Sequence, residues 1–343
     1  MKTGIVGSGT WGTALAIVLA HNGHEVVLRS RLEEGCNAFR LTHRHKNLPG
    51  AVLPDSIRFT TELEEAIEDK DLIVLAVPSI YVRKTAEEMK AFVKPKQIVV
   101  VVAKGIEEGS LKTMTDIVEE VIPAADAAVL SGPSHAEEVS RLIPTTIVAG
   151  AHSEKTAKII QNAFMNNSFR VYINPDMRGI EIGAALKNVI ALASGIADGL
   201  GYGDNTKAAL ITRGIAEITR LGVKMGCAVE TFNGLSGMGD LIVTCASMHS
   251  RNRRAGILIG KGRSYNEAMQ EIGQVVEGVY AAKAALELAD QYEVSMPIVE
   301  GVNQVLFSGK DPEKAVQDLM MRDKRSENSI LKFNDEGTCQ SNV

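Results

Sequence analysis

The sequence of 343 residues predicts an α/β domain built on a doubly wound parallel sheet, followed by an all-α domain. From residue 3 to about 175, short apolar and β-branched segments alternate with helical ones, which is typical of a parallel sheet buried on both faces. Three glycines in GxGxxG spacing follow the first apolar segment. After Asn174-Pro175-Asp176 the strand pattern stops and long helical periods begin. We expect domains at 1–176 and 177–327, and a flexible tail at 328–343, which lacks periodicity.

Local composition defines the expected elements in order. Apolar runs predict strands at TGIV, EVVLR, IRFT, DLIVLAV, QIVVVV, AAVL, TTIVAG and FRVYI. A helix is expected between the first two strands, ending at His21 before an Asn22-Gly23 stop. The stretch TELEEAIEDKD (61–71) is expected to be a helix whose acidic residues form a solvated face. The second domain is expected to contain a long helix from about Lys207 to Lys224.

Composition limits the kinds of partner that the chain can bind. The chain is 45% hydrophobic and 23% charged, as soluble globular proteins are, and its formal net charge is −5. No global basic field therefore attracts nucleic acid or an anionic membrane. An anionic small ligand would need a local basic pocket instead.

The four cysteines, at positions 36, 227, 245 and 339, show neither a CxxC motif nor metal-ligand spacing. This pattern predicts reduced thiols and no metal site. The first strand begins at about Lys2, which leaves no length for a signal peptide. Apolar runs such as IVVVVA (98–103) are far shorter than the ~20 residues of a membrane span. We therefore expect a cytoplasmic protein without a membrane segment.

The glycine motif predicts a dinucleotide site. The stretch TGIVGSGTWGTALAIVLAHNGHEVVLRSR places Gly7, Gly9 and Gly12 between a strand and an apolar helix, as in a Rossmann-type domain. Gly7 would permit a tight turn, Gly9 a close approach to a pyrophosphate, and Gly12 the packing of helix on strand. Free N–H groups at the helix start would then bind the anion. The alternative is a glycine-rich turn without a ligand.

The end of the second strand bears on the choice of cofactor. An acidic residue that binds the ribose of NAD is normal there, but this chain has Arg29, Ser30 and Arg31. Because an arginine at this place pairs with a 2′-phosphate, we favour NADPH/NADP over NADH/NAD. The alternative is that both arginines are ordinary surface residues.

One lysine interrupts the apolar stretch GAALKNVIALASGIADGL (183–200). On a helix, Lys187 shares a face with the small residues Gly183, Ala184, Ala191 and Ser194. Small side chains leave room for a ligand or for the close backbone of another helix. The alternative is a lysine that extends its ammonium group to water.

Polar groups elsewhere indicate a site for a phosphorylated molecule. Asp240 follows two glycines, and Ser250-Arg251-Asn252-Arg253-Arg254 offers guanidinium forks with neutral donors beside them, a set that suits a phosphoester. A solvated helix start or a nucleic-acid patch are the alternatives, and the acidic net charge and lack of nearby aromatics argue against nucleic acid.

Two predicted strands also end in polar groups, at Lys104 and at Gly132-Pro133-Ser134-His135. Ligands of open α/β sheets bind beyond the carboxyl ends of the strands, so Lys104 and Ser134 should face cofactor and substrate. His135 is either a proton carrier or a structural histidine at a helix start.

Taken together, these segments resemble the bacterial-type NAD(P)-dependent glycerol-3-phosphate dehydrogenases. The resemblance runs from about Gly4 to Glu327, on GSGTWGTALA, VVAKGIE, SGPSHAEEV, ALKNVIALASGIADGLGYGDNTKAALITRGIAEI, LSGMGDLIVTCASMHSRNRRAG and GQVVEGVYAAKAA, in this order. It implies a Rossmann domain and a helical domain that closes over the substrate. It also implies a homodimer that interconverts dihydroxyacetone phosphate and sn-glycerol 3-phosphate and supplies phospholipid synthesis.

The resemblance further implies the residues of the site. Lys187 would be the proton acceptor in oxidation. Substrate contacts would come from Lys104, Gly132, Ser134, Lys187, Asp240, Ser250, Arg251 and Asn252. Besides the motif glycines, cofactor contacts would come from Thr10, Trp11, Arg31, Lys104, Ala136, Arg251, Val275 and Glu277. The chain departs from the family at Arg29, where tryptophan is common, and at Asn47, where tyrosine is common.

Oxidation of a secondary alcohol needs a base beside the nicotinamide. A lysine is a poor base at its ordinary pKa of ~10.4, but burial and a second ammonium group lower that pKa. Lys104 would act in this direction, whereas Asp240 would oppose the shift and orient the ammonium group. Two alternatives stay open: a β-hydroxyacid dehydrogenase with a carboxylate substrate, and a dinucleotide-binding redox sensor or scaffold without turnover.

Overall fold

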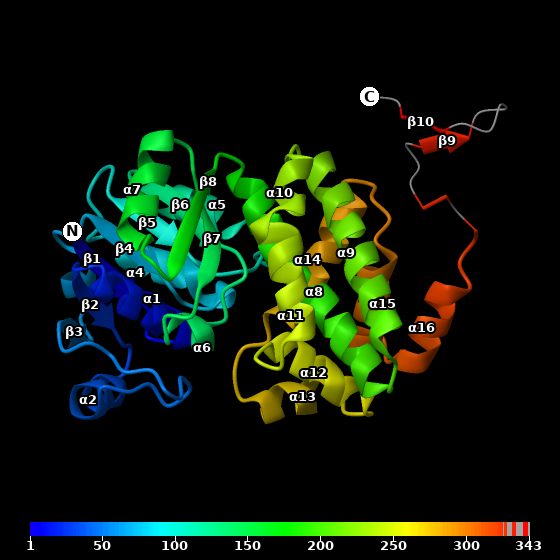
Figure 1. The fold of residues 1–343 in the computed structure, drawn as a ribbon, viewed down its shortest axis with the longest axis horizontal. Helices are drawn as coiled ribbons and strands as arrows, with labels where there is room; N and C mark the ends of the chain where they lie inside the picture. The colour runs from blue at the N-terminus through cyan, green and yellow to red at the C-terminus, as the bar shows by residue number, and fades with distance from the viewer. Residues whose placement is uncertain (325, 328–330, 334–338, 342–343) are drawn as a thin grey trace.

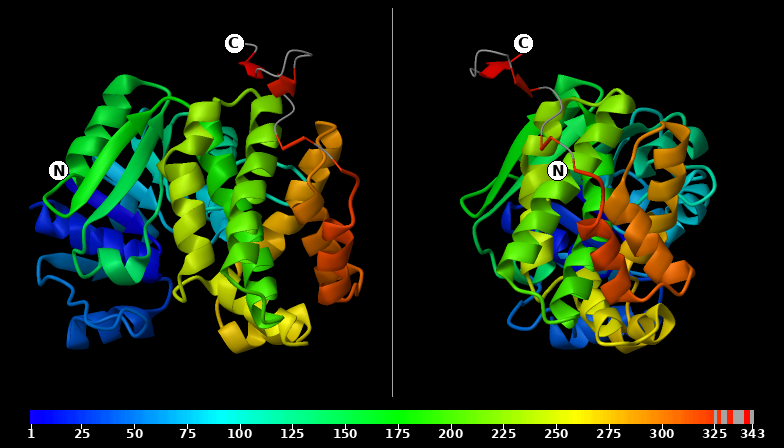
Figure 2. Two further views of the ribbon diagram at one scale, coloured as in Figure 1. Left: turned by 45° about the vertical axis from the view of Figure 1, so that its right-hand side comes forward. Right: turned by 90° about the vertical axis from the view of Figure 1, so that its right-hand side faces the viewer.

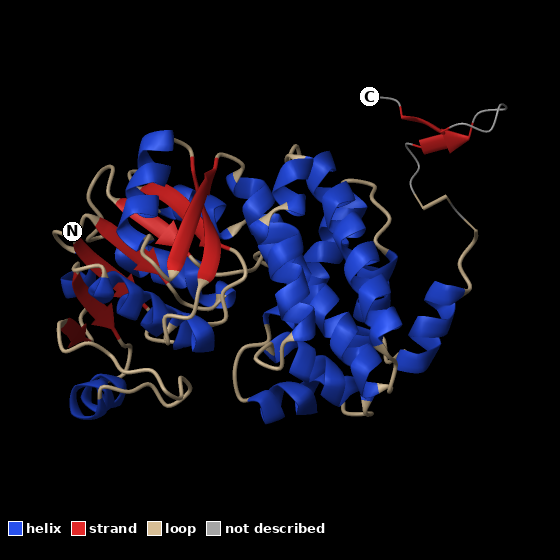
Figure 3. Ribbon diagram, in the orientation of Figure 1, coloured by secondary structure: helices blue, strands red, loops and turns tan. Residues whose placement is uncertain are grey.

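The computed structural model describes residues 1–324, 326–327, 331–333 and 339–341. Figure 1 shows a sheet-containing N-terminal half beside a helical C-terminal half. Figure 3 shows the same division, with the strands of the large sheet confined to the first half. This is the predicted fold class, an α/β part followed by a helical part, and the prediction is confirmed.

The large sheet has eight strands in the order β3-β2-β1-β4-β5-β6-β7-β8. Its strands are β1 (Lys2–Val6), β2 (Glu25–Arg29), β3 (Ile57–Thr60), β4 (Leu72–Leu75), β5 (Ile98–Val101), β6 (Asp126–Ser131), β7 (Thr145–Ala151) and β8 (Phe169–Asn174). The order of the first six is that of a dinucleotide-binding sheet, with the switch point at β1 and β4. All eight strands were predicted from the apolar runs.

The sheet differs from the prediction in one respect, because it is not wholly parallel. β7 pairs with β6 in the antiparallel direction, and β8 then pairs with β7 in the parallel direction. The connection from β6 to β7 contains only the four-residue helix α6 (Ala136–Val139). A helix of this length cannot carry the chain back across the sheet, which a parallel connection requires, so β7 returns from the same edge.

Helices cover both faces of this sheet. Ile5 and Leu28 lie in the core that packs against α1, α2, α6 and α7, whereas Val6 and Val27 lie in the core that packs against α3, α4 and α5. The bounds are α1 (Thr10–His21), α2 (Glu33–Thr42), α3 (Leu63–Ile67), α4 (Val82–Met89), α5 (Met114–Val121) and α7 (Glu154–Phe164), with a 3₁₀ turn, η1 (Ser79–Tyr81), before α4. The inner strands are therefore buried on both faces, as their continuous apolar runs predict, whereas the edge strand β8 exposes Arg170 and Tyr172.

The helical half is arranged around α8 (Met177–Gly199), which lies among the other helices of this half in Figures 1 and 2. The others are α9 (Asp204–Lys224), α10 (Val229–Asn233), α11 (Asp240–Ala246), α12 (Arg251–Gly260), α13 (Tyr265–Ile272), α14 (Glu277–Gln291), α15 (Pro297–Phe307) and α16 (Pro312–Met320), with a π-helical turn, η2 (Leu235–Gly239), before α11.

By length and composition α8 could also cross a membrane, but its whole apolar window is buried inside the fold. The uninterrupted apolar runs in the sequence did not predict a helix of this length and hydropathy. Glu181 and Lys187 divide the apolar residues of α8 into shorter runs. Since the window is fully buried, α8 is the core helix of this half.

Small residues on α8 allow another helix to lie against its backbone. A Cβ atom on Gly195 would lie 2.1 Å from the Arg253 carbonyl oxygen, and one on Gly256 would lie 2.2 Å from the Leu192 carbonyl oxygen. Both distances are impossible for real side chains, so α8 and α12 pack closely only because these positions are glycine. Part of the space left by small residues is thus filled by a helix backbone.

The boundary between the halves is short. β8 ends at Asn174 and α8 begins at Met177. The Asp176 side chain accepts a hydrogen bond from the Gly179 N–H, at 2.9 Å, and so caps α8. In the tail, β9 (Leu331–Phe333) pairs with β10 (Cys339–Ser341). The rest of 328–343 lies outside the described residues, so the flexibility of the tail stays a prediction.

Candidate active site

Lys187 lies in the middle of α8, and only 5% of its surface is exposed. Its Nζ atom donates to Asp240 Oδ1 at 2.6 Å and to Thr244 Oγ1 at 2.7 Å. The alternative in which this ammonium group extends to water is therefore wrong. The Lys187 ammonium group is therefore bound by two polar side chains inside the apolar core of the helical half.

Lys104 reaches the same carboxylate from the other half of the molecule. It follows β5, and its Nζ atom donates to Asp240 Oδ2 at 2.7 Å and to the Gly132 carbonyl oxygen at 2.9 Å. The Ser134 Oγ atom lies 3.5 Å from the same nitrogen. Two strand ends of the Rossmann part thus meet the first residue of α11, as ligand sites of α/β sheets require.

Asp240 joins the two ammonium groups. It is 1% exposed, and burial alone would raise the pKa of its carboxyl group. Lys104 and Lys187 together outweigh the effect of burial and lower this pKa. The carboxylate is therefore charged, and each of its oxygens accepts from a different lysine.

Burial is the main reason why the pKa of Lys187 is lowered, to about 8. Lys104 lowers it further, whereas Asp240 raises it. A lysine with this pKa exchanges its proton near neutral pH, which is the property a general acid or base needs. The direction is the one predicted from the sequence.

The glycine motif forms a cradle at the start of α1. Gly7 has a φ of +121°, a backbone conformation that favours glycine, and a Cβ atom on Gly12 would lie 2.0 Å from the Gly7 carbonyl oxygen. A Cβ atom on Gly9 would meet nothing within 4 Å. Gly9 is the N-cap of α1 and no side chain caps this helix start, so its N–H groups fit the pyrophosphate of a dinucleotide.

The other predicted cofactor residues lie at the ends of several elements. Thr10 begins α1, and the buried indole Nε1 atom of Trp11 has no hydrogen-bond partner within the described structure. Ala136 begins α6, and Val275 precedes α14. Arg31 is exposed two residues beyond the end of β2. Contact between these residues and a dinucleotide stays a prediction.

The arginines of the cluster at residues 250–254 make different contacts. Arg251, at the start of α12, is half-buried, and burial lowers the pKa of its guanidinium group, against the effect of Glu277. Arg253 instead donates to Asp198 Oδ2 at 2.7 Å and ties α12 to the end of α8. Ser250 caps α12 by accepting from the Arg253 N–H. Arg254, the third arginine of the cluster, has a buried Nε atom without a partner among the described residues. Binding of a phosphate by Arg251 stays a prediction.

Asn252 and Glu277 make contacts inside the protein. Asn252 donates to Asn188 Oδ1 at 2.9 Å and accepts from the Gly278 N–H at 2.8 Å. The Glu277 carboxylate accepts from the Ser79 N–H at 3.0 Å and from the Ser79 hydroxyl. Asn252 therefore joins α12 to α8 and α14 within the helical half, whereas Glu277 joins the helical half to the Rossmann half.

His135 lies near the pair of lysines. Burial is the main cause that lowers its pKa to about 4, and Lys187 acts in the same direction. The ring is therefore neutral at pH 7, and its buried Nε2 atom has no described partner. The imidazolium form that could give up a proton is thus absent at neutral pH.

Sequence reasoning missed two residues of this constellation. Thr244 lies four residues after Asp240 on α11, so the helical period could have placed both on one face. Asn188 donates to the Lys104 carbonyl oxygen at 3.3 Å and accepts from Asn252. No spacing in the sequence indicates this contact, because its partners are far apart along the chain.

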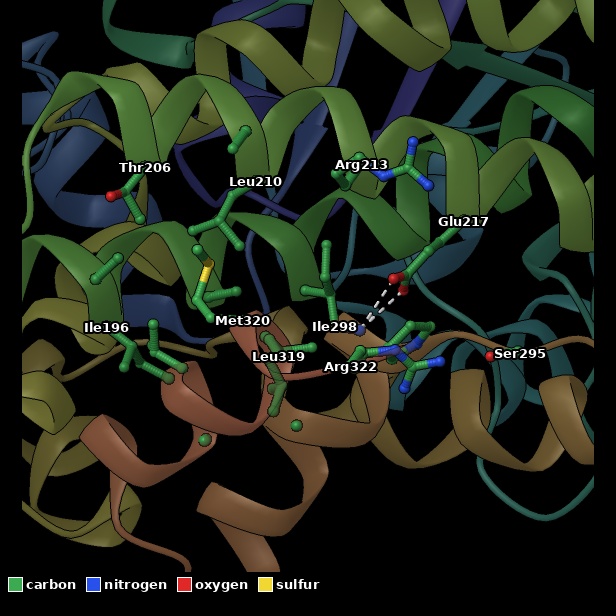
Figure 4. Close-up of a pocket in the computed structure, with 18 of the residues that line it drawn as sticks. Ile196, Thr206, Leu210, Arg213, Glu217, Ser295, Ile298, Leu319, Met320 and Arg322 are labelled. Carbon is green, nitrogen blue, oxygen red and sulfur yellow. Dashed lines mark hydrogen bonds between the residues drawn. The ribbon is translucent and has the colours of Figure 1, made fainter. Parts of the chain in front are cut away.

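A cavity of about 480 Å³ lies between α8, α9, α15 and α16 (Figure 4). Ile196, Leu210, Leu319 and Met320 line it, with Glu217 at one end, and its described lining includes none of the predicted site residues. Among the residues that the structure describes, no group of three or more His, Cys, Asp or Glu could hold a metal ion.

Two family models match most of the chain. Residues 2–157 match the N-terminal part of NAD-dependent glycerol-3-phosphate dehydrogenase, and residues 176–317 match its C-terminal part. The first match ends within α7, and the second begins at Asp176, just before α8.

Curated relatives and a solved structure agree with these models. The chain is 59% identical over 333 residues to glycerol-3-phosphate dehydrogenase [NAD(P)+] of Agathobacter rectalis, covering 97% of this chain and 99% of that protein. It is 51% identical to the protein of this name in Bacillus subtilis, covering 95% and 96%. The crystal structure of glycerol-3-phosphate dehydrogenase from Coxiella burnetii is 36% identical, with a TM-score of 0.90 over 94% of this chain and 99% of that chain.

Proposed function

Because the chain belongs to the family of NAD-dependent glycerol-3-phosphate dehydrogenases, we propose that Lys187 moves the proton in its reaction. The chain is an NAD(P)-dependent oxidoreductase that interconverts sn-glycerol 3-phosphate and dihydroxyacetone phosphate. This family membership sets aside both the carboxylate substrate and the sensor without turnover. One observation supports the role of Lys187 above all: its buried ammonium group lies 2.6 Å from Asp240, which also binds Lys104.

When bound, NAD(P) would supply the hydride acceptor for oxidation at C2 of the alcohol and the hydride donor for reduction of the ketone. In oxidation, neutral Lys187 takes the proton of the C2 hydroxyl group. In reduction, charged Lys187 polarises the carbonyl oxygen and supplies the proton. Asp240 orients the Lys187 amine, and burial, helped by Lys104, lowers the pKa of this amine. Gly132 and Ser134 present a carbonyl and a hydroxyl oxygen at the same place.

The phosphate of the substrate is proposed to bind Ser250, Arg251 and Asn252 at the start of α12. Free N–H groups, the helix dipole and a guanidinium group all favour an anion there. A phosphate held away from the reacting carbon fixes C2 against the nicotinamide and supports closure of the helical half.

Replacing Arg251 by alanine should raise KM for dihydroxyacetone phosphate about 10- to 100-fold, since a hydrogen bond to a charged group contributes ~1.5–3 kcal/mol. The kcat value should change less. Steady-state kinetics measure both. Arg263→Ala, which removes an exposed arginine of the loop after α12, is the control and should leave KM unchanged. An unchanged KM in Arg251→Ala would remove Arg251 from the phosphate site.

NADPH is proposed as the preferred cofactor, because Arg31 is exposed beyond the end of β2, where a 2′-phosphate would lie. Arg29 is less available, since its Nε atom donates to the Thr61 carbonyl oxygen at 3.0 Å. We expect kcat/KM to be higher with NADPH than with NADH, and Arg31→Ala to reduce this preference about tenfold or more. A strong preference for NADH in the unchanged protein would reject the assignment.

We also propose a cytoplasmic homodimer that supplies glycerol 3-phosphate for phospholipid synthesis. The proposal follows from family resemblance. In support of a dimer, Met320 and Met321 at the end of α16 are 78% and 84% exposed, so the helical half has apolar surface that a second copy could cover.

A further inference from the structure

α8 contacts both ends of the segment that joins Lys104 to α5. Near its middle, Asn188 donates to the Lys104 carbonyl oxygen at 3.3 Å. Closer to its start, Glu181 accepts from the Thr115 N–H at 2.9 Å. Lys104 and Thr115 belong to the Rossmann half, whereas Glu181, Lys187 and Asn188 belong to one helix of the other half. α8 is therefore joined to the Rossmann half both near Lys104 and at the start of α5.

Glu181 is docked at the start of α5. It is 3% exposed, and its second oxygen accepts from the Thr115 hydroxyl group. Thr113 and Asp116 already form a capping box on α5, and the Thr115 N–H is a further helix-start donor without a partner in its own helix. The N-terminal end of a helix dipole is positive, so it stabilises the negative charge of the Glu181 carboxylate.

This contact has an energetic cost. Burial is the main cause that raises the pKa of Glu181 to about 7, and Asp116 adds to it, whereas the bonds from Thr115 oppose it. An apolar side chain of similar size would fill the space without this desolvation cost. Unlike an apolar side chain, however, the carboxylate requires one particular register between α8 and α5.

We propose that Glu181 is a positioning residue, which by docking α8 on the start of α5 fixes Lys187 relative to Lys104. Lys187 is six residues further along the same helix, about 9 Å along its axis, so a shift at Glu181 is carried to the amine. The inference rests on the proposed role of Lys187. Displacement of the Lys187 amine by about 1 Å would lower kcat by up to ~100-fold.

Glu217 provides a matched control in the same half. It is also 3% exposed, burial also raises its pKa to about 7, and it also accepts from the start of a helix, at the Ile298 N–H, 3.0 Å away (Figure 4). Its partners, however, lie on α15 within the helical half. Glu217 therefore shares the burial of Glu181 but not its contact with the Rossmann half.

The test compares Glu181→Ala, Glu181→Gln and Glu217→Ala in the full chain. Glycerol 3-phosphate oxidation gives kcat and KM, NADPH fluorescence gives cofactor affinity, and urea unfolding gives stability. We expect Glu181→Ala to lower kcat about 10- to 100-fold with cofactor affinity within about threefold. Glu181→Gln should recover most of kcat, because its amide oxygen accepts from Thr115. Glu217→Ala should lose stability but keep kcat within about twofold.

A folded Glu181→Ala protein with the original kcat would overturn the proposal, as would an equal loss of kcat in Glu217→Ala. If Glu181→Ala does not fold, Thr115→Val removes only the hydroxyl donor. It should then lower kcat severalfold without changing cofactor affinity, and an unchanged kcat would overturn the proposal. Should Lys187→Met retain turnover, the proposed function fails. Should Lys187→Met lose turnover while Glu181→Ala keeps it, only this inference fails.

Discussion

Replacing Lys187 by methionine is expected to lower kcat about 10²- to 10⁴-fold in both directions, the usual contribution of general acid–base catalysis. Methionine occupies a similar volume to lysine but has no ionisable group. The affinity for the dinucleotide should stay near its original value, because the cradle at Gly7, Gly9 and Gly12 lies on the other half. Stopped-flow turnover and NADPH fluorescence measure the two quantities separately.

The control for this variant is Lys224→Met, which removes a lysine from the exposed end of α9. It should keep full turnover. If Lys187→Met kept full turnover as well, Lys187 would have no part in proton transfer. If the variant instead lost dinucleotide affinity and turnover together, its effect would be structural.

Asp240→Asn should have the largest effect on stability. The carboxylate neutralises two ammonium groups, from Lys104 and Lys187, and an amide leaves both without a counter-charge in a buried site. Loss of one partner of a buried ion pair costs about 3–5 kcal/mol. We expect a decrease of this order in the unfolding free energy at pH 6, measured by urea denaturation.

The loss of stability in Asp240→Asn should depend on pH. In the variant, loss of the Asp240 charge lowers the pKa of the buried Lys187 amine below its value of about 8 in the original protein, so the folded variant binds fewer protons than the unfolded chain over a wider pH range. Stability therefore rises with pH, and the deficit relative to the original protein should shrink between pH 6 and pH 10. A deficit that is constant over this range, or absent at pH 6, would show that Asp240 does not neutralise the two lysines.

The sequence predicted those parts of the fold that are encoded locally. Each strand of the large sheet is a short apolar run, and the tight turn at Gly7 needs glycine for reasons of backbone conformation. The antiparallel direction of β7 was missed, because it depends on the path of a connection and not on the composition of a strand. Helix α8 was recognised as unusual through one residue, Lys187.

The candidate site was predictable to a similar extent. Lys104 was expected at a strand end, and resemblance to the family implied its association with Asp240 and Lys187. The contacts of Ser79 with Glu277 and of Thr115 with Glu181 were not predictable, because they join residues 198 and 66 positions apart. Such pairs arise only when the two halves pack, and neither partner has a local signature in the sequence.

The central claim is that Lys187 exchanges its proton near neutral pH because it is buried beside Lys104 and Asp240. The most direct test is the pH dependence of kcat for glycerol 3-phosphate oxidation between pH 6 and pH 10. Neutral lysine is the acceptor, so kcat should rise through an inflection near pH 8, and Lys187→Arg should abolish this inflection. A profile without an inflection, or one that Lys187→Arg retains, would contradict the account.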